Sequence, residues 1–314
     1  MTIRLGAAGA PPGRPSRPAG LARPSARTHW LGAAVETSRP RQWPKNLLVF
    51  AAPLAGASLG RDEGLGYALV AAAAFTAASA AVYFVNDVAD ADRDRRHPHK
   101  RSRAVASGRL PVRHALALAA LAIAAAEATS LAIGEPRLAA LIAAYVAFSC
   151  LYTLALKHVP VIELVFVAAG FVLRALGGAA ATHVAPSAWF LVVCSLGALM
   201  VAIAKRFTEL AVLGADATRH RPVMRWYTPA VLRLGQRMAT IVMIAAYVLW
   251  AAGEHGGWMR GLHLASAVPV AAALVRFDWL TTHMPGKPVE DLIARDGSMI
   301  CCQLVWLVLF VAGL

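Results

Sequence analysis

Charged residues are scarce in this chain, since Asp, Glu, Lys and Arg make up only 15% of its 314 residues. Hydrophobic residues make up 58%. An ordinary soluble domain carries about 25% charged residues. The shortage of charge therefore excludes such a domain and predicts an all-α polytopic membrane protein, in which apolar helices cross the bilayer.

Cysteine is also rare, and its four residues give no sign of a metal or redox centre. They lie in apolar stretches without Cys-x-x-Cys or His-rich spacing, so we interpret them as small packing residues: Cys150, Cys194, Cys301 and Cys302. The sequence also lacks a P-loop, a Gly-x-Gly-x-x-Gly motif and a zinc motif. The chemistry must therefore be sought in other residues.

Acidic residues number 17 against 31 Lys and Arg, which gives a net charge of +14. If the N-terminus is inside, 27 of the 31 cations fall on the cytoplasmic side of the predicted spans. This asymmetry predicts an N-in, C-out topology, and it explains the net charge without nucleic-acid binding. The apolar stretches predict nine spans, at residues 46–62, 67–86, 113–133, 137–156, 160–181, 187–205, 238–254, 261–277 and 298–314.

The first 37 residues have a different composition from the rest of the chain. They are rich in Pro, Arg, Ala and Gly and contain no sustained apolar segment. We therefore expect a flexible cytoplasmic tail over residues 1–37, not a signal peptide, followed by a membrane domain over residues 38–314.

Oxygen-bearing side chains line the end of the second predicted span. Asn86, Asp87, Asp90 and Asp94 fall within roughly a 100° arc of a helix, whereas Asp92 points elsewhere. Mg²⁺ prefers oxygen ligands and commonly binds through one or two carboxylates together with substrate phosphates. The pattern predicts a magnesium site, and the alternative is a solvated helix end with local Asp–Arg pairs.

A second polar cluster ends the sixth predicted span, on the same side of the membrane. It consists of Lys205, Arg206 and Glu209. Four helices separate the two clusters, which suggests a pseudo-repeated bundle whose halves meet over a central cavity open to the cytoplasm. The alternative is a basic helix end in which Arg206 pairs with Glu209.

Several further cations are candidates for binding phosphate. Lys45 precedes the first span and suits either lipid headgroups or a substrate phosphate, and Lys157 ends the fourth span. Arg174 lies inside an apolar segment, where an ionised side chain is costly, so we favour a phosphate-facing role over a structural ion pair. Glu163 shares its helix face but lies roughly 16 Å away along the axis. The role of Glu127, in the third span, stays open.

The pattern Asn86-Asp-x-x-Asp90-x-x-x-Asp94 at the end of helix two resembles the first Asp-rich motif of the UbiA prenyltransferase superfamily. Within it, the sequence is most similar to the decaprenyl-phosphate phosphoribosyltransferases. Ala104 and Pro44 depart slightly from the expected pattern without changing the charged positions. The resemblance covers residue 39 to near the C-terminus, and its specific segments are residues 39–46, 82–88, 97–103, 156–158, 173–175, 205–210, 232–233 and 290–296.

This resemblance implies a nine-helix UbiA-like bundle that uses Mg²⁺ to transfer 5-phosphoribosyl from phosphoribosyl diphosphate to a polyprenyl phosphate. Asn86 and Asp90 would bind the metal, with Asp87 and Asp94 in support. The implied substrate-binding residues are Lys45, Tyr83, Lys100, Arg101, Arg103, Lys157, Arg174, Lys205, Arg206 and Glu209.

The resemblance also implies a protein of the inner membrane, surrounded by membrane lipids, with its active site on the cytoplasmic side. Both a monomer and a homo-oligomer are compatible with it. It points to cell-wall biogenesis as the pathway. Two alternatives stay open at this point. One is a conventional prenyltransferase that moves an isoprenyl group from its diphosphate to a small acceptor, and the other is a non-catalytic lipid or anion transporter.

Overall fold

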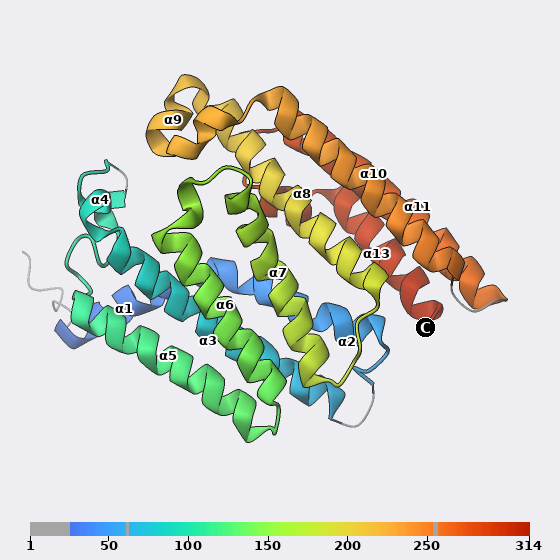
Figure 1. Ribbon diagram of the computed structural model, residues 1–314, viewed down its shortest axis with the longest axis horizontal. Coiled ribbons are helices and arrows are strands. Elements are labelled where there is room, and N and C mark those ends of the chain that lie inside the picture. The colour runs from blue at the N-terminus through green and yellow to red at the C-terminus, as the bar shows by residue number, and fades with distance from the viewer. Residues whose placement is uncertain (1–25, 61–62, 99, 254–256) are drawn as a thin grey trace, which may run out of the picture.

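The computed structural model describes residues 26–60, 63–98, 100–253 and 257–314, and these residues form helices joined by short turns (Figure 1). The expected all-α architecture is therefore confirmed. The longer helices are α3 (Gly64–Ala89), α5 (Val112–Ala132), α6 (Pro136–Leu154), α7 (Ile162–Ala181), α8 (Ala188–Leu213), α10 (Pro229–Gly253), α11 (Trp258–His283) and α13 (Gly297–Ala312).

Shorter elements connect them. The α-helical ones are α1 (Ala26–Ser38), α2 (Ala51–Ala55), α4 (Ala91–Arg95), α9 (Ala217–His220) and α12 (Val289–Arg295). The 3₁₀ segments are η1 (Pro40–Phe50), η2 (Lys100–Ser102), η3 (Leu156–His158), η4 (Gly214–Asp216) and η5 (Pro222–Trp226).

Seven of the described helices are long and apolar enough to cross a membrane, and α12 with α13 makes an eighth if this pair, bent by 64°, counts as one span. These eight match the second to ninth predicted spans in order. The protein is thus a multi-pass membrane protein.

The first predicted span, residues 46–62, is not matched by a helix of that length. The chain there forms η1 and the five-residue helix α2, and residues 61–62 lie outside the described part. Pro44 and Pro53 lack the N–H that a continuous helix needs, which accounts for the interrupted winding. The count of nine spans is therefore not confirmed.

Helix α1 occupies the last third of the predicted tail, while residues 1–25 fall outside the described residues. Its C-terminal part is fixed to the turn before α5, because Arg109 donates two hydrogen bonds, of 2.7 and 2.9 Å, to the carboxylate of Glu36. The division into tail and membrane domain stays a prediction.

Small residues let α7 approach its neighbours closely. A Cβ on Gly178 would lie 1.7 Å from the carbonyl oxygen of Val49 in η1, and one on Gly177 would lie 2.1 Å from the ring of Phe75 in α3. Such contacts suit a bundle in lipid, where packing and not the hydrophobic effect holds helices together. These contacts hold η1, α3 and α7 together as one unit.

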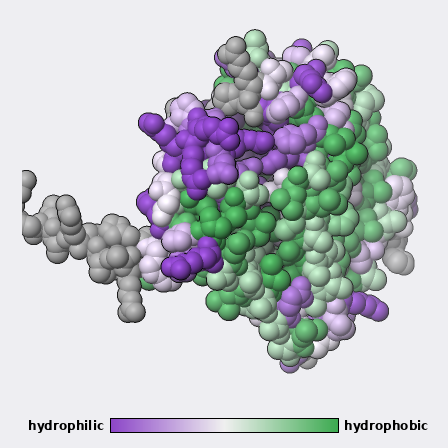
Figure 2. Space-filling view, turned by 60° about the vertical axis from the view of Figure 1, so that its left-hand side comes forward, coloured by the Kyte–Doolittle hydropathy of each residue, from purple (hydrophilic) through white to green (hydrophobic). Residues whose placement is uncertain are grey.

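Polar residues gather at one end of the bundle. Figure 1 places α4 and α9 toward the same end, and Figure 2 shows hydrophilic residues concentrated on one part of the surface beside a broad apolar area. The ends of α3 and α8 that carry predicted site residues meet the short elements at this polar end, as does η3, which follows α6 and carries Lys157.

Candidate active site at the polar end of the bundle

The acidic ladder lies where α3 ends and α4 follows. Asp87 and Asp94 are buried, and each carboxylate is paired with arginine. Arg39 donates a hydrogen bond of 2.6 Å to Asp87, and Arg103 donates one of 2.8 Å to Asp94 while its nitrogen stands 3.6 Å from Asp87. Burying two carboxylates is tolerated because these guanidinium groups compensate the charge.

Asp90 is less enclosed than its two neighbours. Its Oδ1 accepts a hydrogen bond of 2.8 Å from Lys157 of η3, and Arg93 lies 3.9 Å away. Asn86, one helical turn earlier, is half-buried. Asn86 and Asp90 therefore present accessible oxygen atoms, while Asp87 and Asp94 are held in arginine pairs.

Arg174 reaches across from α7 and is buried. Its guanidinium donates to the side-chain oxygens of Asn46 at 2.7 Å, Tyr145 at 2.8 Å and Ser79 at 3.2 Å, and to the Gly170 carbonyl at 2.6 Å. These acceptors are all uncharged, so within the described part of the chain no hydrogen-bonded carboxylate neutralises this cation. Arg174 is thus held in one orientation by four uncharged hydrogen-bond acceptors.

A third group links η1, α8 and α12 through the carboxylate of Glu290. Lys205 donates a hydrogen bond of 2.7 Å to Glu290, and the Nζ of Lys45 lies 3.1 Å from the same oxygen. Burial, together with the charges of Lys205 and Arg174, lowers the pKa of Lys45 to about 8, against the opposing effect of Glu290.

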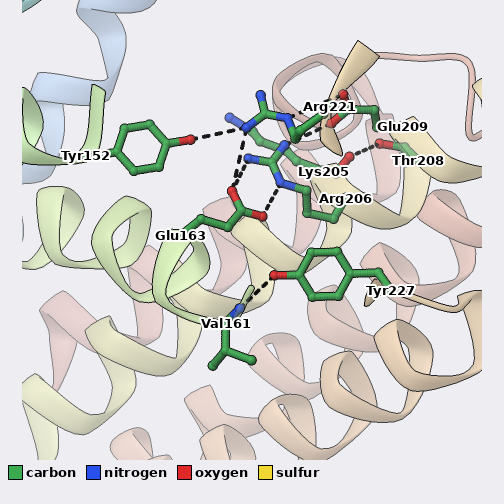
Figure 3. Close-up of polar contacts among 9 residues, drawn as sticks. All are labelled: Tyr152, Val161, Glu163, Lys205, Arg206, Thr208, Glu209, Arg221 and Tyr227. Carbon is green, nitrogen blue, oxygen red and sulfur yellow. Dashed lines mark hydrogen bonds and ion pairs between the residues drawn. The ribbon is translucent and has the colours of Figure 1, made fainter. Parts of the chain in front are cut away.

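The second predicted cluster forms a buried ion network (Figure 3). The carboxylate of Glu163 is completely inaccessible to solvent and accepts two hydrogen bonds from Arg206, of 2.6 and 2.7 Å. Arg206 also bonds Glu209 at 2.9 Å, and Arg221 approaches Glu163, Glu209 and Tyr152 at 3.7, 3.6 and 3.3 Å. The guanidinium of Arg206 is therefore engaged by two carboxylates of the protein itself.

A strained backbone leads into this network. Val161, just before α7, has a φ of 64°, which is unusual for a β-branched residue. Its N–H donates a hydrogen bond of 2.9 Å to the hydroxyl of Tyr227, as Figure 3 shows. Such strain costs about 1–3 kcal/mol and persists only where the surroundings impose it. The turn places Glu163 in the first turn of α7, beneath Arg206.

The groups adjoin one another. The charges of Arg174 and Lys205 act on Lys45. Burial and the charges of Lys157, Arg93 and Arg221 lower the pKa of His158, and the charge of Asp90 opposes them. His158 thus lies near both Asp90 of the acidic ladder and Arg221 of the Arg206 network, so the two groups are neighbours. Tyr83 packs beneath Arg39, with its ring centroid 4.6 Å from the guanidinium carbon. By contrast, Lys100 and Arg101 are exposed on η2.

Sequence reasoning missed some residues that belong to the site. Arg39 and Glu290 lie in segments that resemble the family, but neither was assigned a role. Asn46 and Arg221 were not assigned one either. Glu163 was considered only because it shares a helix face with Arg174. The buried Glu163 offered a usable signal, because an acid in an apolar segment needs a cation. The partners of Arg39 and Asn46 come from distant parts of the chain, which local spacing does not reveal.

Comparison with known proteins identifies the fold family. The model of the UbiA prenyltransferase family matches residues 47–289. This chain belongs to the UbiA prenyltransferase family. The family recognised from the Asp-rich motif is thereby confirmed.

Relatives within the UbiA family cover nearly the whole chain. Decaprenyl-phosphate phosphoribosyltransferase of Mycolicibacterium smegmatis is 37% identical over 296 residues, which cover 88% of this chain and 91% of the relative. The enzyme of the same name from Corynebacterium glutamicum is 33% identical over 277 residues, covering 87% and 83%. A UbiA homologue from Archaeoglobus fulgidus, solved with GPP and Mg²⁺, has the same fold, with a TM-score of 0.68 at 15% identity, covering 90% and 97%.

The oxygen donors of this UbiA member fit a magnesium ion that is shared with a substrate. Within the described ranges, no three His, Cys, Asp or Glu side chains gather closely enough to hold a metal alone. Mg²⁺ does not need such a cage, since it usually binds one or two carboxylates, waters and substrate phosphates. Asn86 and Asp90 provide an amide and a carboxylate one turn apart, beside cations suited to those phosphates.

A large apolar cavity of 1240 Å³ lies between the η1–α2 segment and helices α8, α10, α11 and α13, and none of the charged residues of the site lines it. Leu47 and Leu304 line it from η1 and α13, and both side chains are more than half exposed, which indicates an opening on the apolar flank of the bundle. A long apolar molecule can therefore enter sideways from the membrane. Its wall also includes Ile293 of α12, three residues after Glu290.

Proposed function

We propose that this UbiA-family transferase moves the 5-phosphoribosyl group from phosphoribosyl diphosphate to a polyprenyl phosphate and releases diphosphate. One observation carries the assignment to two phosphorylated substrates: cations outnumber acids around the single acidic ladder. Seven cations there face four carboxylates, and the hydrogen bonds of Arg174 go only to neutral groups. The names of the relatives, which align with most of this chain, support the same reaction.

The reaction exchanges one oxygen for another at C1 of the ribose. The bond from C1 to the diphosphate oxygen breaks, and its electron pair leaves with the diphosphate. A new bond forms between C1 and an oxygen of the lipid phosphate. This oxygen is already ionised at neutral pH, so no strong general base is needed. The enzyme mainly has to place the two anions and stabilise charge on the leaving group.

The residues divide this work. Asn86 and Asp90 would hold Mg²⁺, which when bound neutralises negative charge on the diphosphate. Asp87 and Asp94 keep Arg39 and Arg103 at the rim of the site. Lys157 and Arg174 bind phosphate oxygens, and Tyr83 donates a hydrogen bond to the donor. Lys100 and Arg101, which are exposed on η2, attract the sugar diphosphate from solution.

The Arg206 network takes a different role from that of a phosphate clamp. Arg206 already makes three hydrogen bonds to two carboxylates, and freeing it would leave Glu163 buried without its partner. We infer that Arg206 and Glu209 shape the side of the active site against which the ribose 5-phosphate lies, with Arg221 as the more accessible cation of the network.

The acceptor tail lies in the 1240 Å³ cavity and continues into the bilayer. The charge asymmetry of the sequence supports an N-in, C-out orientation, in which the chain from Asn46 through α2 belongs to a ninth crossing and the active site lies on the cytoplasmic side of the cell membrane. Cell-wall biogenesis as the pathway and assembly into a homo-oligomer belong to the same proposal.

The decisive experiment supplies the purified protein in detergent with labelled phosphoribosyl diphosphate, decaprenyl phosphate and Mg²⁺. A labelled ribosylated lipid should form together with an equal amount of diphosphate. A parallel reaction contains geranylgeranyl diphosphate and an aromatic acceptor. Product only in the parallel reaction would replace the proposal with conventional prenyl transfer, and binding without diphosphate release would indicate a transporter.

A further inference from the structure

The carboxylate of Glu290 lies where a single phosphate would fit. It lies between Lys45 and Lys205, at 3.1 and 2.7 Å, and one oxygen atom contacts both ammonium groups. Its side chain is 42% exposed, in contrast to the inaccessible Glu163 of the neighbouring network. Glu290 is therefore a partly exposed internal anion on a pair of cations, where solvent screens part of each ion pair.

Lys45 and Glu290 lie a few residues along the chain from the wall of the apolar cavity, although neither they nor Lys205 line it. Leu47 and Leu48, which follow Lys45 closely in the chain, line the cavity wall. So does Ile293, one turn after Glu290 on the seven-residue helix α12. Two cations close to wall residues of a large apolar cavity complement an amphiphile that has one phosphate and an apolar chain.

We propose that Lys45 and Lys205 bind the phosphate of the acceptor lipid and that Glu290 occupies this place until the lipid displaces it. This inference rests on the proposed function and divides its cations between the two substrates. Lys45 and Lys205 serve the lipid, whereas Lys157, Arg174 and the acidic ladder serve the sugar diphosphate. Glu290 is a positioning residue, because it acts on the lipid only through the two lysines.

Displacement has a measurable consequence. Because the Glu290 carboxylate competes with the lipid phosphate for the two lysines, it lowers the affinity of the protein for the lipid. Only a negatively charged headgroup can replace the carboxylate. A neutral polyprenol cannot displace Glu290. The internal anion therefore makes the site select phosphorylated over unphosphorylated lipids.

The test compares Glu290→Gln with Asp291→Asn. Asp291 is a matched control, since it lies on the same helix with 41% of its side chain exposed and pairs with Arg295 instead of the two lysines. Removing the competing charge should lower the KM for polyprenyl phosphate roughly threefold to tenfold, as expected for two partly exposed ion pairs. The KM for phosphoribosyl diphosphate should not change. An unchanged or higher lipid KM in Glu290→Gln would overturn the proposal.

A double-mutant cycle separates competition from a structural role. In the Lys205→Met background the gain from Glu290→Gln should shrink, because one of the contested cations is gone. Equal gains in both backgrounds would contradict the exchange. Glu290→Asp, which keeps the charge, should retain a lipid KM near that of the unmodified protein, and a fall matching that of Glu290→Gln would also overturn it.

Binding without the sugar donor distinguishes this proposal from the proposed function. Tryptophan fluorescence is titrated with a polyprenyl monophosphate, or with the matching polyprenol, in detergent micelles. Tighter binding of the phosphate to Glu290→Gln, with no change for the alcohol, supports the exchange even if no ribosyl transfer occurs. Ribosyl transfer with identical lipid binding in both proteins would leave the proposed function standing and exclude the role of Glu290.

Discussion

Replacing Arg174 with methionine removes a buried positive charge while preserving most of the side-chain volume. The four hydrogen-bond acceptors of Arg174 are neutral, and two of them, Ser79 and Tyr145, already lie 3.1 Å apart and can bond each other. The loss of folding stability should therefore be modest, about 1–3 kcal/mol. The effect on catalysis should be larger, because the charge acts on the phosphates.

The size of that effect follows from Coulomb's law. A unit charge about 6 Å from a phosphate charge, at an effective dielectric constant of about 20, contributes about 3 kcal/mol. This corresponds to a loss on the order of 100-fold in kcat/KM. Arg174→Lys keeps the charge but loses the planar guanidinium that reaches both Asn46 and Tyr145. Its kcat/KM should therefore fall about tenfold.

Initial rates of diphosphate release in reconstituted lipid provide the assay, and Arg137→Met provides the control. Arg137 is an exposed arginine at the start of α6, at the end opposite the acidic ladder, so its replacement should leave the rate nearly unchanged. Equal activities of Arg174→Met and Arg137→Met, in folded protein, would refute the assignment of Arg174 to the substrate phosphates.

Three other changes test the site and the fold. Asp90→Ala should abolish Mg²⁺-dependent turnover in a folded protein, and near-normal rates with Mg²⁺ would exclude its role. Because the pKa of Lys45 is lowered to about 8, its charge is present below and lost above that pH, so the lipid KM should rise through pH 8. Lys205, Glu290 and Arg174 are the charges that act on it, and Lys45→Arg should flatten the profile. Gly178→Ala should destabilise the protein by about 1–3 kcal/mol or more, seen as a lower Tm, because its Cβ would meet the Val49 carbonyl.

Helices with a continuous apolar pattern were predictable from the sequence. The ends of α5 and α6 lie within two residues of the predicted ones, because each is bounded by a loop and contains no proline beyond its first turn. The first span was wrongly expected as a single helix. Its apolar composition matched a span, but Pro44 and Pro53 determine how the backbone winds.

The chemistry of the site was predictable where neighbours in the sequence are neighbours in space. Asn86 and Asp90 share a helix face because they are four residues apart, and the Arg206–Glu209 pair follows from a spacing of three. The partners of Arg174 were not predictable, since they come from η1, α3 and α6. The bidentate pair of Arg206 with Glu163 likewise joins residues that are 43 positions apart.

The contact of Gly178 with the carbonyl of Val49 has a bearing on how the enzyme tolerates different bilayers. No side chain lies between the backbones of α7 and η1 at this contact. The distance between the two elements is therefore set by backbone atoms, which have no alternative rotamers. Asn46 bonds Arg174 across the same interface. In a thinner or thicker membrane, α7 and η1 would therefore tilt together, and the distance between Arg174 and Lys45 would stay the same. Peripheral helices such as α5 would adjust to the mismatch in thickness.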